Sequence, residues 1–220
     1  MVVLFWDLDG TLLMTGRAGL FAFEEALHVV TGVEASLQDL PTAGLTDAGV
    51  VRLMLEHIGV EATPERIEAV LREYEQRLPA SLPRRQGRVL DGIREVLEDF
   101  RDDPTVRSYL LTGNTPAGAR AKLVHYGLDG FFPEGEGTFC IDHGTRSDLA
   151  RRALPLAEGA DAVYVIGDTP ADVECGKAID ARTIAVTSGW HPLEELEATD
   201  PWIVLDRIPE PAEFRKLLGV

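Results

Sequence analysis

The fold of this chain is decided by one stretch near its start, Val2-Val3-Leu4-Phe5-Trp6-Asp7-Leu8-Asp9-Gly10-Thr11. Its five apolar residues, 2–6, are β-prone and predict one buried strand. Asp7 and Asp9 lie two residues apart, so in extended backbone their side chains project to the same side, just beyond that strand. Because open α/β sheets bind ligands at the carboxyl ends of their strands, we expect a site here. A plain Asp-Gly turn is the alternative interpretation.

The composition predicts a folded, acidic protein. The chain has 220 residues, of which 45% are hydrophobic and 26% charged, enough for one domain with a modest insert or for two small domains. The formal net charge of −16 argues against nucleic acid and anionic membrane as partners, because both bind basic surfaces. No segment reaches transmembrane length and no signal peptide is recognisable, so we expect a soluble, cytoplasmic protein. Cys140 and Cys175 lack metal-ligand spacing and are expected to be buried, reduced thiols.

A helical insert follows the first strand. Apolar residues recur at helical spacing over residues 20–30, 46–58 and 63–78, with no strand between them. Thr46-Asp47 and Thr63-Pro64 are typical of helix starts. We therefore predict a small all-helical unit of residues 14–85.

Beyond Gly87 the pattern alternates between helix and strand. Strands are expected over residues 108–111, 162–166, 183–186 and 202–205, and helices over residues 93–100, 116–126, 147–157, 170–179, 193–196 and 214–218. Asp91 is expected to cap the first of these helices. Such alternation implies an α/β fold with a parallel sheet and helices on both of its faces.

Two more strand ends carry polar residues ahead of a helix. Thr112-Gly113-Asn114 precedes a helix start at Thr115-Pro116, which favours an anion site made of free backbone N–H groups, with a capped polar loop as the alternative. The second strand end reads Gly167-Asp168-Thr169-Pro170-Ala171-Asp172. There Asp172 fits a capping pair with Thr169, whereas Asp168 has no structural duty and suggests a site for a hard cation.

These three motifs, in this order, resemble the haloacid dehalogenase-like phosphatase superfamily. The resemblance is closest to the phosphoglycolate-phosphatase-like branch with a small helical cap, and it covers essentially the whole chain. It implies a Rossmann-like core domain of residues 1–13 and 86–220, with residues 14–85 inserted as the cap. It also implies a phosphoric monoester hydrolase that depends on Mg²⁺.

The resemblance implies a role for each matching residue. Asp7 would be the nucleophile that forms an aspartyl-phosphate, and Asp9 the general acid and then the general base. The Asp7 carboxylate, the Asp9 backbone carbonyl and Asp168 would hold Mg²⁺, supported by Asp172. Because Asp9 is present, phosphate ester hydrolysis is favoured over dehalogenation.

The transferring phosphoryl group would be bound by Thr112, Gly113 and Asn114. The family also uses a cation, most often lysine, and our candidate for this catalytic and phosphate-binding group is Arg146. If Thr145 caps a helix here, the helix dipole disfavours a cation at position 146, a conflict that phosphate or the acidic cluster would relieve. A solvated surface arginine is the alternative.

Two lysines are weaker candidates for this cation. Lys122 is expected in the middle of a helix and Lys177 lies well past the last motif.

The cap should set substrate specificity. Arg17, Thr46 and Asp47 resemble cap positions that approach the active site in this branch. A helix N-cap is the alternative for Thr46 and Asp47, and a solvated side chain for Arg17. Trp190 is expected to pack in the core or a loop.

Three functions follow from these observations. The first is a phosphatase of a small phosphorylated metabolite, with phosphoglycolate as the nearest family substrate. The second is a sugar-phosphate mutase of the same superfamily, similar to β-phosphoglucomutase. The third is a non-catalytic relative that binds a metal or a metabolite. The sequence leaves the substrate and the choice between monomer and dimer open.

Overall fold

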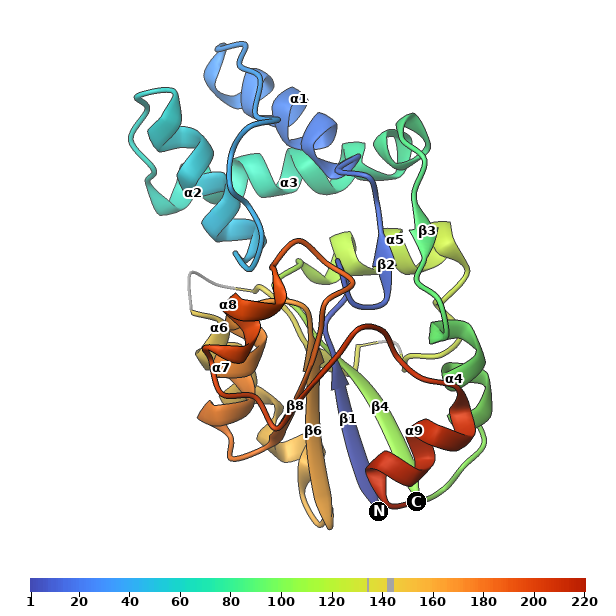
Figure 1. The fold of residues 1–220 in the computed structure, drawn as a ribbon. Coiled ribbons are helices and arrows are strands. Elements are labelled where there is room, and N and C mark those ends of the chain that lie inside the picture. The colour runs from blue at the N-terminus through green and yellow to red at the C-terminus, as the bar shows by residue number, and fades with distance from the viewer. Residues whose placement is uncertain (134, 142–144) are drawn as a thin grey trace.

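The computed structural model describes residues 1–133, 135–141 and 145–220, and it shows a parallel sheet with a bundle of helices above it (Figure 1). The sheet has the strand order β5-β4-β1-β6-β7-β8. Its strands are β1 (Val2–Trp6), β4 (Val106–Leu111), β5 (Gly137–Thr138), β6 (Ala162–Gly167), β7 (Arg182–Val186) and β8 (Ile203–Leu205). Every neighbouring pair is parallel, which confirms the predicted sheet.

Helices cover both faces of this sheet, as predicted. The core helices are α4 (Ile93–Phe100), α5 (Pro116–Tyr126), α6 (Arg146–Ala153), α7 (Pro170–Ala178), α8 (Leu193–Glu197) and α9 (Pro211–Leu218). Leu4 and Trp6 of β1 belong to the apolar cluster that includes residues of α4, α5 and α9, whereas Val3 and Phe5 belong to a second cluster with α6 and α7. Successive side chains of a strand point to opposite faces, so β1 is buried on both. Because β1 lies between β4 and β6, its carboxyl end lies near the middle of that edge of the sheet.

The predicted insert forms three helices with an apolar cluster of their own. They are α1 (Gly19–Thr31), α2 (Asp47–His57) and α3 (Pro64–Ser81), followed by the 3₁₀ turn η1 (Leu82–Arg84). The rings of Phe23 and Tyr74 stack with their centroids 3.7 Å apart, joining α1 to α3. This architecture confirms the predicted α/β core with an inserted helical cap, while the domain limits at residues 14 and 85 stay a prediction.

A short stem joins the cap to the core. It consists of β2 (Leu13–Met14) and β3 (Arg88–Val89), which pair antiparallel. Figure 1 shows both strands running from the core up to the helices. Strands of two residues leave no periodic pattern, so the sequence did not predict the stem.

Two local predictions are wrong. The helix expected over residues 147–157 ends at Ala153 and continues as the 3₁₀ turn η2 (Leu154–Ala157), because Pro155 has no N–H to donate to an α-helical bond. The cap expected at Asp91 is absent, since α4 begins after Gly92 without a side-chain cap. Gly92 has φ 80°, and a Cβ there would lie 2.6 Å from the Ile208 carbonyl oxygen. The close approach of the Ile208 backbone to Gly92 therefore fixes where α4 begins.

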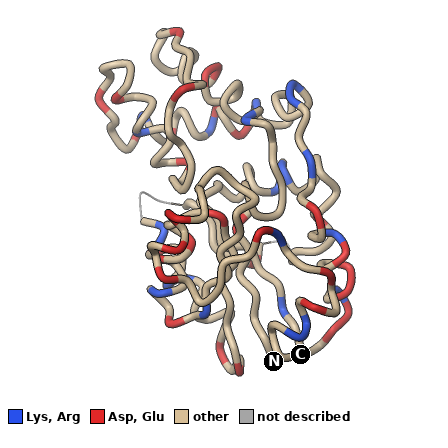
Figure 2. Tube along the Cα trace, in the orientation of Figure 1, with Lys and Arg blue, Asp and Glu red and all other residues tan. Residues whose placement is uncertain are grey.

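The charged residues are distributed over the cap and the core (Figure 2). Within the residues that the structure describes, no helix combines the length and apolar character needed to cross a membrane. Cys140 and Cys175 are both buried, and neither forms a disulfide bond, which confirms the expectation for the two thiols.

Candidate active site

Three aspartates meet at the carboxyl ends of β1 and β6. Trp6 of β1 pairs with Ile166 of β6, so Asp7 and Asp168 leave the sheet at nearly the same level. Asp172 joins them from the first turn of α7. All three are buried, and one carboxylate oxygen from each lies within 4.8 Å of the others. We call Asp7, Asp168 and Asp172 the three-aspartate cluster.

Two glycines, Gly10 and Gly189, make room for the side chain of Asp168. A Cβ on Gly10, where φ is 90°, would lie 2.3 Å from Asp168 Oδ2, and a Cβ on Gly189 would lie 1.6 Å from the same oxygen. Thr11 donates its hydroxyl to Asp168 Oδ1 over 3.3 Å. Gly10 of the opening motif is thus required by its conformation and by the carboxylate beside it.

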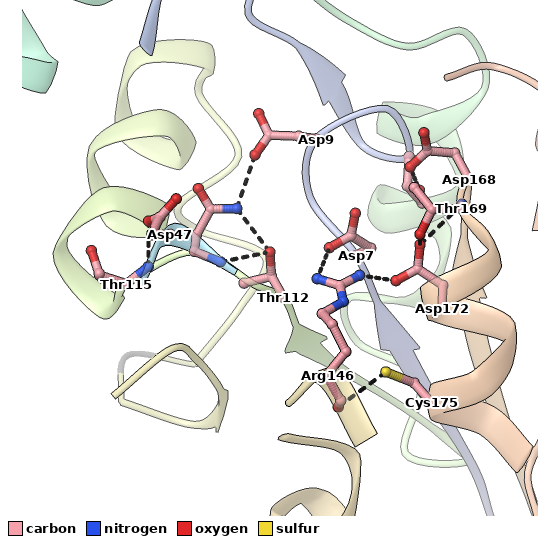
Figure 3. Close-up of polar contacts among 12 residues, drawn as sticks. Asp7, Asp9, Asp47, Thr112, Thr115, Arg146, Asp168, Thr169, Asp172 and Cys175 are labelled. Atoms are coloured by element: carbon pink, nitrogen blue, oxygen red, sulfur yellow. Dashed lines mark hydrogen bonds and ion pairs between the residues drawn. The ribbon is translucent and has the colours of Figure 1, made fainter. Parts of the chain in front are cut away.

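Arg146 enters this cluster from α6. Thr145 caps this helix and forms a capping box with Asp148, which places Arg146 at the first position of the helix. Its side chain is only 10% exposed; Nη1 lies 3.3 Å from Asp7 Oδ1, and Nη2 is paired with Asp172 (Figure 3). The structure therefore contradicts a solvated surface arginine. The acidic partners offset the unfavourable helix dipole at this position.

Asp172 has a double role. Thr169 donates to its Oδ2 from the backbone N (3.1 Å) and from Oγ1 (2.7 Å), which confirms the predicted capping pair. Its Oδ1 accepts from Arg146. The same carboxylate thus begins α7 and anchors the arginine.

The charges of the three-aspartate cluster are unbalanced. Burial, together with repulsion from Asp172, raises the pKa of Asp7 to about 7 even though Arg146 lowers it. Burial and the repulsion of Asp172 and Asp7 raise the pKa of Asp168 to about 8. Burial opposes the charge of Arg146, but Asp172 and Asp7 outweigh it and raise the pKa of the guanidinium. One guanidinium does not offset three buried carboxylates, so the donor set fits a bound divalent cation.

Asp9 belongs to a separate set of contacts on the cap side of the site. Its Oδ2 accepts from Asn114 Nδ2 over 2.9 Å and from Lys122 Nζ over 2.5 Å. Lys122 Nζ also lies 2.5 Å from Asn114 Oδ1, and Asn114 Nδ2 donates to Thr112 Oγ1 over 2.9 Å. We call Asp9, Asn114 and Lys122 the Asp9 network.

Lys122 has a larger part in the site than its position in the sequence indicates. It lies in the middle of a helix, as expected, yet its side chain is only 8% exposed and points at Asp9. The missed signal is helical spacing: Thr115, the N-cap of α5, and residue 122 are seven positions apart and therefore share one face of the helix. Because α5 starts at the site, a side chain two turns along this face, such as Lys122, still reaches it.

The residues predicted to bind phosphate, Thr112, Gly113 and Asn114, form a loop that contacts the cap, and we call it the phosphate loop. Thr112 is completely buried, and its N donates to Thr138 O over 3.0 Å. Asp47 N donates to Gly113 O over 2.7 Å, and Asp47 Oδ2 accepts from Thr115 N over 2.7 Å. Two hydrogen bonds from one cap residue therefore join α2 to the loop.

The cap residues differ in their roles. Thr46 caps α2 by accepting from Gly49 N over 3.1 Å, which confirms the N-cap interpretation for this residue. Asp47 does more than begin α2, because it also bonds to Gly113 O and Thr115 N. Burial raises the pKa of Asp47 to about 6, although Lys122 lowers it. Arg17 is half-buried and donates to Leu40 O over 3.1 Å, while its buried Nε has no partner in the described part of the chain.

A cavity of about 320 Å³ lies between the cap and the core, within the usual size of a small-molecule site. It is lined on the core side by Asp7, Asp9, Lys122, Arg146 and Asp168. Trp190, which lies in a loop, also lines it and is 63% exposed, so the expectation of core packing is wrong for this side chain.

Comparison with known proteins places the chain in a family. The profile of the haloacid dehalogenase-like hydrolases matches residues 4–177, and a second profile, described as haloacid dehalogenase hydrolase-like, matches residues 145–211. This chain belongs to the haloacid dehalogenase-like hydrolase family. The predicted superfamily and enzyme class, a phosphoric monoester hydrolase, are confirmed.

Several phosphatases and related structures are similar to it. The protein named probable phosphatase IndB of Dickeya dadantii is 27% identical over 209 residues, 93% of this chain and 89% of that protein. The phosphoglycolate phosphatase of Pectobacterium atrosepticum is 23% identical, covering 97% of this chain and 91% of its own. The structure of a predicted phosphatase from Clostridium acetobutylicum has a TM-score of 0.74 at 21% identity, covering 100% of this chain and 98% of that one.

Proposed function

We propose that this protein hydrolyses small phosphate monoesters in a Mg²⁺-dependent reaction through an aspartyl-phosphate on Asp7. The observation that carries the proposal is the buried meeting of Asp7, Asp168, Asp172 and Arg146 at the carboxyl ends of the central strands. Carboxylates crowded there to the point of raised pKa values need positive charge, and Mg²⁺ is a cation held by carboxylates and substrate phosphate.

The metal would be held by Asp7, Asp168 and the backbone carbonyl of Asp9, with Asp172 behind them. When bound, Mg²⁺ would supply positive charge that offsets the repulsion between Asp7 and a phosphate. Asp172 would keep its present task of holding Arg146 at the cluster.

The residues of the chain would divide the chemistry. A carboxylate oxygen of Asp7 attacks phosphorus while the bond from phosphorus to the leaving oxygen breaks. Asp9 gives its proton to that leaving oxygen, and in the second step takes a proton from the water that attacks the aspartyl-phosphate. Arg146, beside Asp7, offsets negative charge on the transferring group.

Thr112, Gly113 and Asn114 would bind the phosphoryl oxygens. They lie between the end of β4 and the start of α5, where the positive end of the helix dipole favours an anion. The docked Asp47 holds this loop from the cap side. The cap wall of the cavity would then select the organic part of the substrate.

The test is inorganic phosphate release from a panel of phosphorylated metabolites, with Mg²⁺ or EDTA, beside Asp7→Asn. The panel includes phosphoglycolate, because a phosphoglycolate phosphatase is among the similar proteins. We expect Mg²⁺-dependent release that falls by about 10⁴-fold in the variant, since no nucleophile remains. The matched control is Asp161→Asn, an 85% exposed carboxylate at the opposite end of β6, which should leave release unchanged.

Three outcomes would contradict the proposal. Phosphate release that is unchanged in Asp7→Asn would exclude the aspartyl-phosphate. Transfer of phosphate between sugar positions without release would favour the mutase, and no turnover with retained metal binding the non-catalytic relative.

A further inference from the structure

One buried cation of this site has no part in the chemistry proposed above. Lys122 is 8% exposed, and its ammonium lies 2.5 Å from Asp9 Oδ2 and 2.5 Å from Asn114 Oδ1. A buried ammonium needs polar partners, and both of these are predicted active-site residues. Lys122 also comes from the helix that begins at the phosphate loop.

We propose that Lys122 is a positioning residue, which together with Asn114 holds one oxygen of Asp9 so that the other oxygen transfers the proton. This inference rests on the proposed function, because it takes Asp9 as the general acid and base. It assigns Lys122 a task that acts through Asp9 and not on the substrate.

The two oxygens of Asp9 have different surroundings. Oδ2 accepts hydrogen bonds from Asn114 Nδ2 and from Lys122 Nζ, whereas Oδ1 has no hydrogen-bond partner among the residues described. The Asp9 side chain is 40% exposed and lines the cavity. An exposed aspartate samples several rotamers, so two donors on one oxygen select the orientation in which the other oxygen faces the substrate.

Lys122 also sets the orientation of Asn114. The side-chain amide of Asn114 donates through Nδ2 to Asp9 and to Thr112 Oγ1, and it accepts through Oδ1 from the ammonium. If the amide were reversed, its NH₂ group would face the ammonium and its oxygen would face the carboxylate, leaving donors against donors and acceptors against acceptors. Removing Lys122 thus loosens both contacts that hold Asp9.

The experiment compares Lys122→Met with the wild type on two leaving groups. An alkyl alkoxide needs the proton of Asp9 as its bond to phosphorus breaks, whereas p-nitrophenolate leaves as a stable anion without it. We expect kcat/KM for the best alkyl phosphate to fall by about 30- to 100-fold, at or below the lower limit of the roughly 10²- to 10⁴-fold that general acid–base catalysis supplies, because Asp9 itself remains. The pre-steady-state burst of p-nitrophenolate should change by less than about threefold.

The matched control is Lys177→Met. Lys177 lies on α7, pairs with Glu174 and is 44% exposed, so both activities should match the wild type. Thermal unfolding of each variant verifies the fold. If Lys122→Met does not fold, Lys122→Gln, which keeps a hydrogen-bond donor, is measured in the same way and should show a smaller loss with the same preference.

A second comparison tests whether Lys122 acts through Asp9. In an Asp9→Asn background, Lys122→Met should cause a further loss of less than about threefold, because the group that it positions no longer transfers a proton. Equal losses on both leaving groups, or a full loss in the Asp9→Asn background, would show a structural role and overturn the proposal. Unchanged activity on both esters would overturn it as well.

Failure of the proposed function is recognised separately. It would appear as a wild type without phosphate release, or as Asp7→Asn with wild-type activity. Failure of the Lys122 proposal would appear with both of those results as expected and without any dependence on the leaving group.

Discussion

The two polar sets of this site lie side by side but differ in their charge balance. The three-aspartate cluster opposes Asp7, Asp168 and Asp172 with one guanidinium, and the pKa values of Asp7 and Asp168 are raised. In the Asp9 network, Lys122 and an amide hold the single carboxylate. The first set has less positive than negative charge, whereas the carboxylate of the second is neutralised by Lys122.

This difference indicates how each set would respond to change. Properties of the three-aspartate cluster should depend on metal and pH, because protons or a cation have to supply the missing charge. Properties of the Asp9 network should depend on side-chain geometry and little on metal. Each of the following predictions breaks or sharpens this contrast.

Among these predictions, the largest effect is expected from Asp168→Asn, which removes charge from the cluster and keeps its shape. Phosphate release should fall by roughly 10³-fold, because a main metal ligand is lost. Mg²⁺ should no longer raise the melting temperature, as measured by thermal unfolding with and without the ion. A Mg²⁺-induced stabilisation equal to that of the wild type would show that the cluster does not hold the metal.

A smaller loss is expected when Arg146 is replaced. Arg146→Met should lower kcat/KM by about 10²-fold and destabilise the fold by about 3 kcal/mol, since two buried carboxylates lose their partner. Arg146→Lys keeps a cation without the paired donors, so it should recover about tenfold of that activity. Steady-state kinetics and urea unfolding measure both effects, and equal activity of the two variants would exclude a role for the charge.

The next largest effect is expected in the pH dependence of stability, which should come from the three-aspartate cluster. Because Asp7 and Asp168 have raised pKa values, the native state without metal holds more protons than the unfolded state between about pH 4 and pH 8. In EDTA the free energy of unfolding should therefore fall as pH rises through this window, and Mg²⁺ should stabilise more at pH 8 than at pH 6. Asp168→Asn should flatten the EDTA profile, and a profile that rises with pH would contradict the charge imbalance.

The smallest effect concerns the cap that docks beside the Asp9 network. Thr46→Ala and Thr63→Ala each remove an N-cap and should cost about 1 kcal/mol in urea unfolding. Thr46 starts the helix that meets Gly113, whereas Thr63 caps α3 elsewhere in the cap. Only Thr46→Ala should raise KM, by about threefold, if α2 holds the phosphate loop. An equal change of KM in both variants would show a general effect of cap stability.

Local patterns predicted much of this structure. Periodicity and capping residues within a few positions of each other predicted the strand of residues 2–6 and the parallel sheet. They also predicted the helix starts at Thr46, Thr63, Thr115 and Thr145. Their causes are local, so the sequence contains them. The stem of β2 and β3 and the start of α4 depend on contacts with distant backbone, and these were missed or predicted wrongly.

The sequence by itself determined that Asp7, Asp9, Thr112 and Asp168 lie at the same edge of one sheet, because each follows an apolar strand and parallel strands share their carboxyl ends. Only the tertiary structure decided which cation meets which carboxylate. Arg146 reaches Asp7 and Asp172, and Lys122 reaches Asp9, through side chains from different helices. The spacing of Thr115 and Lys122 places the lysine on the face of α5 that starts at the site, but the packing of the helices on the sheet decides which carboxylate each cation meets.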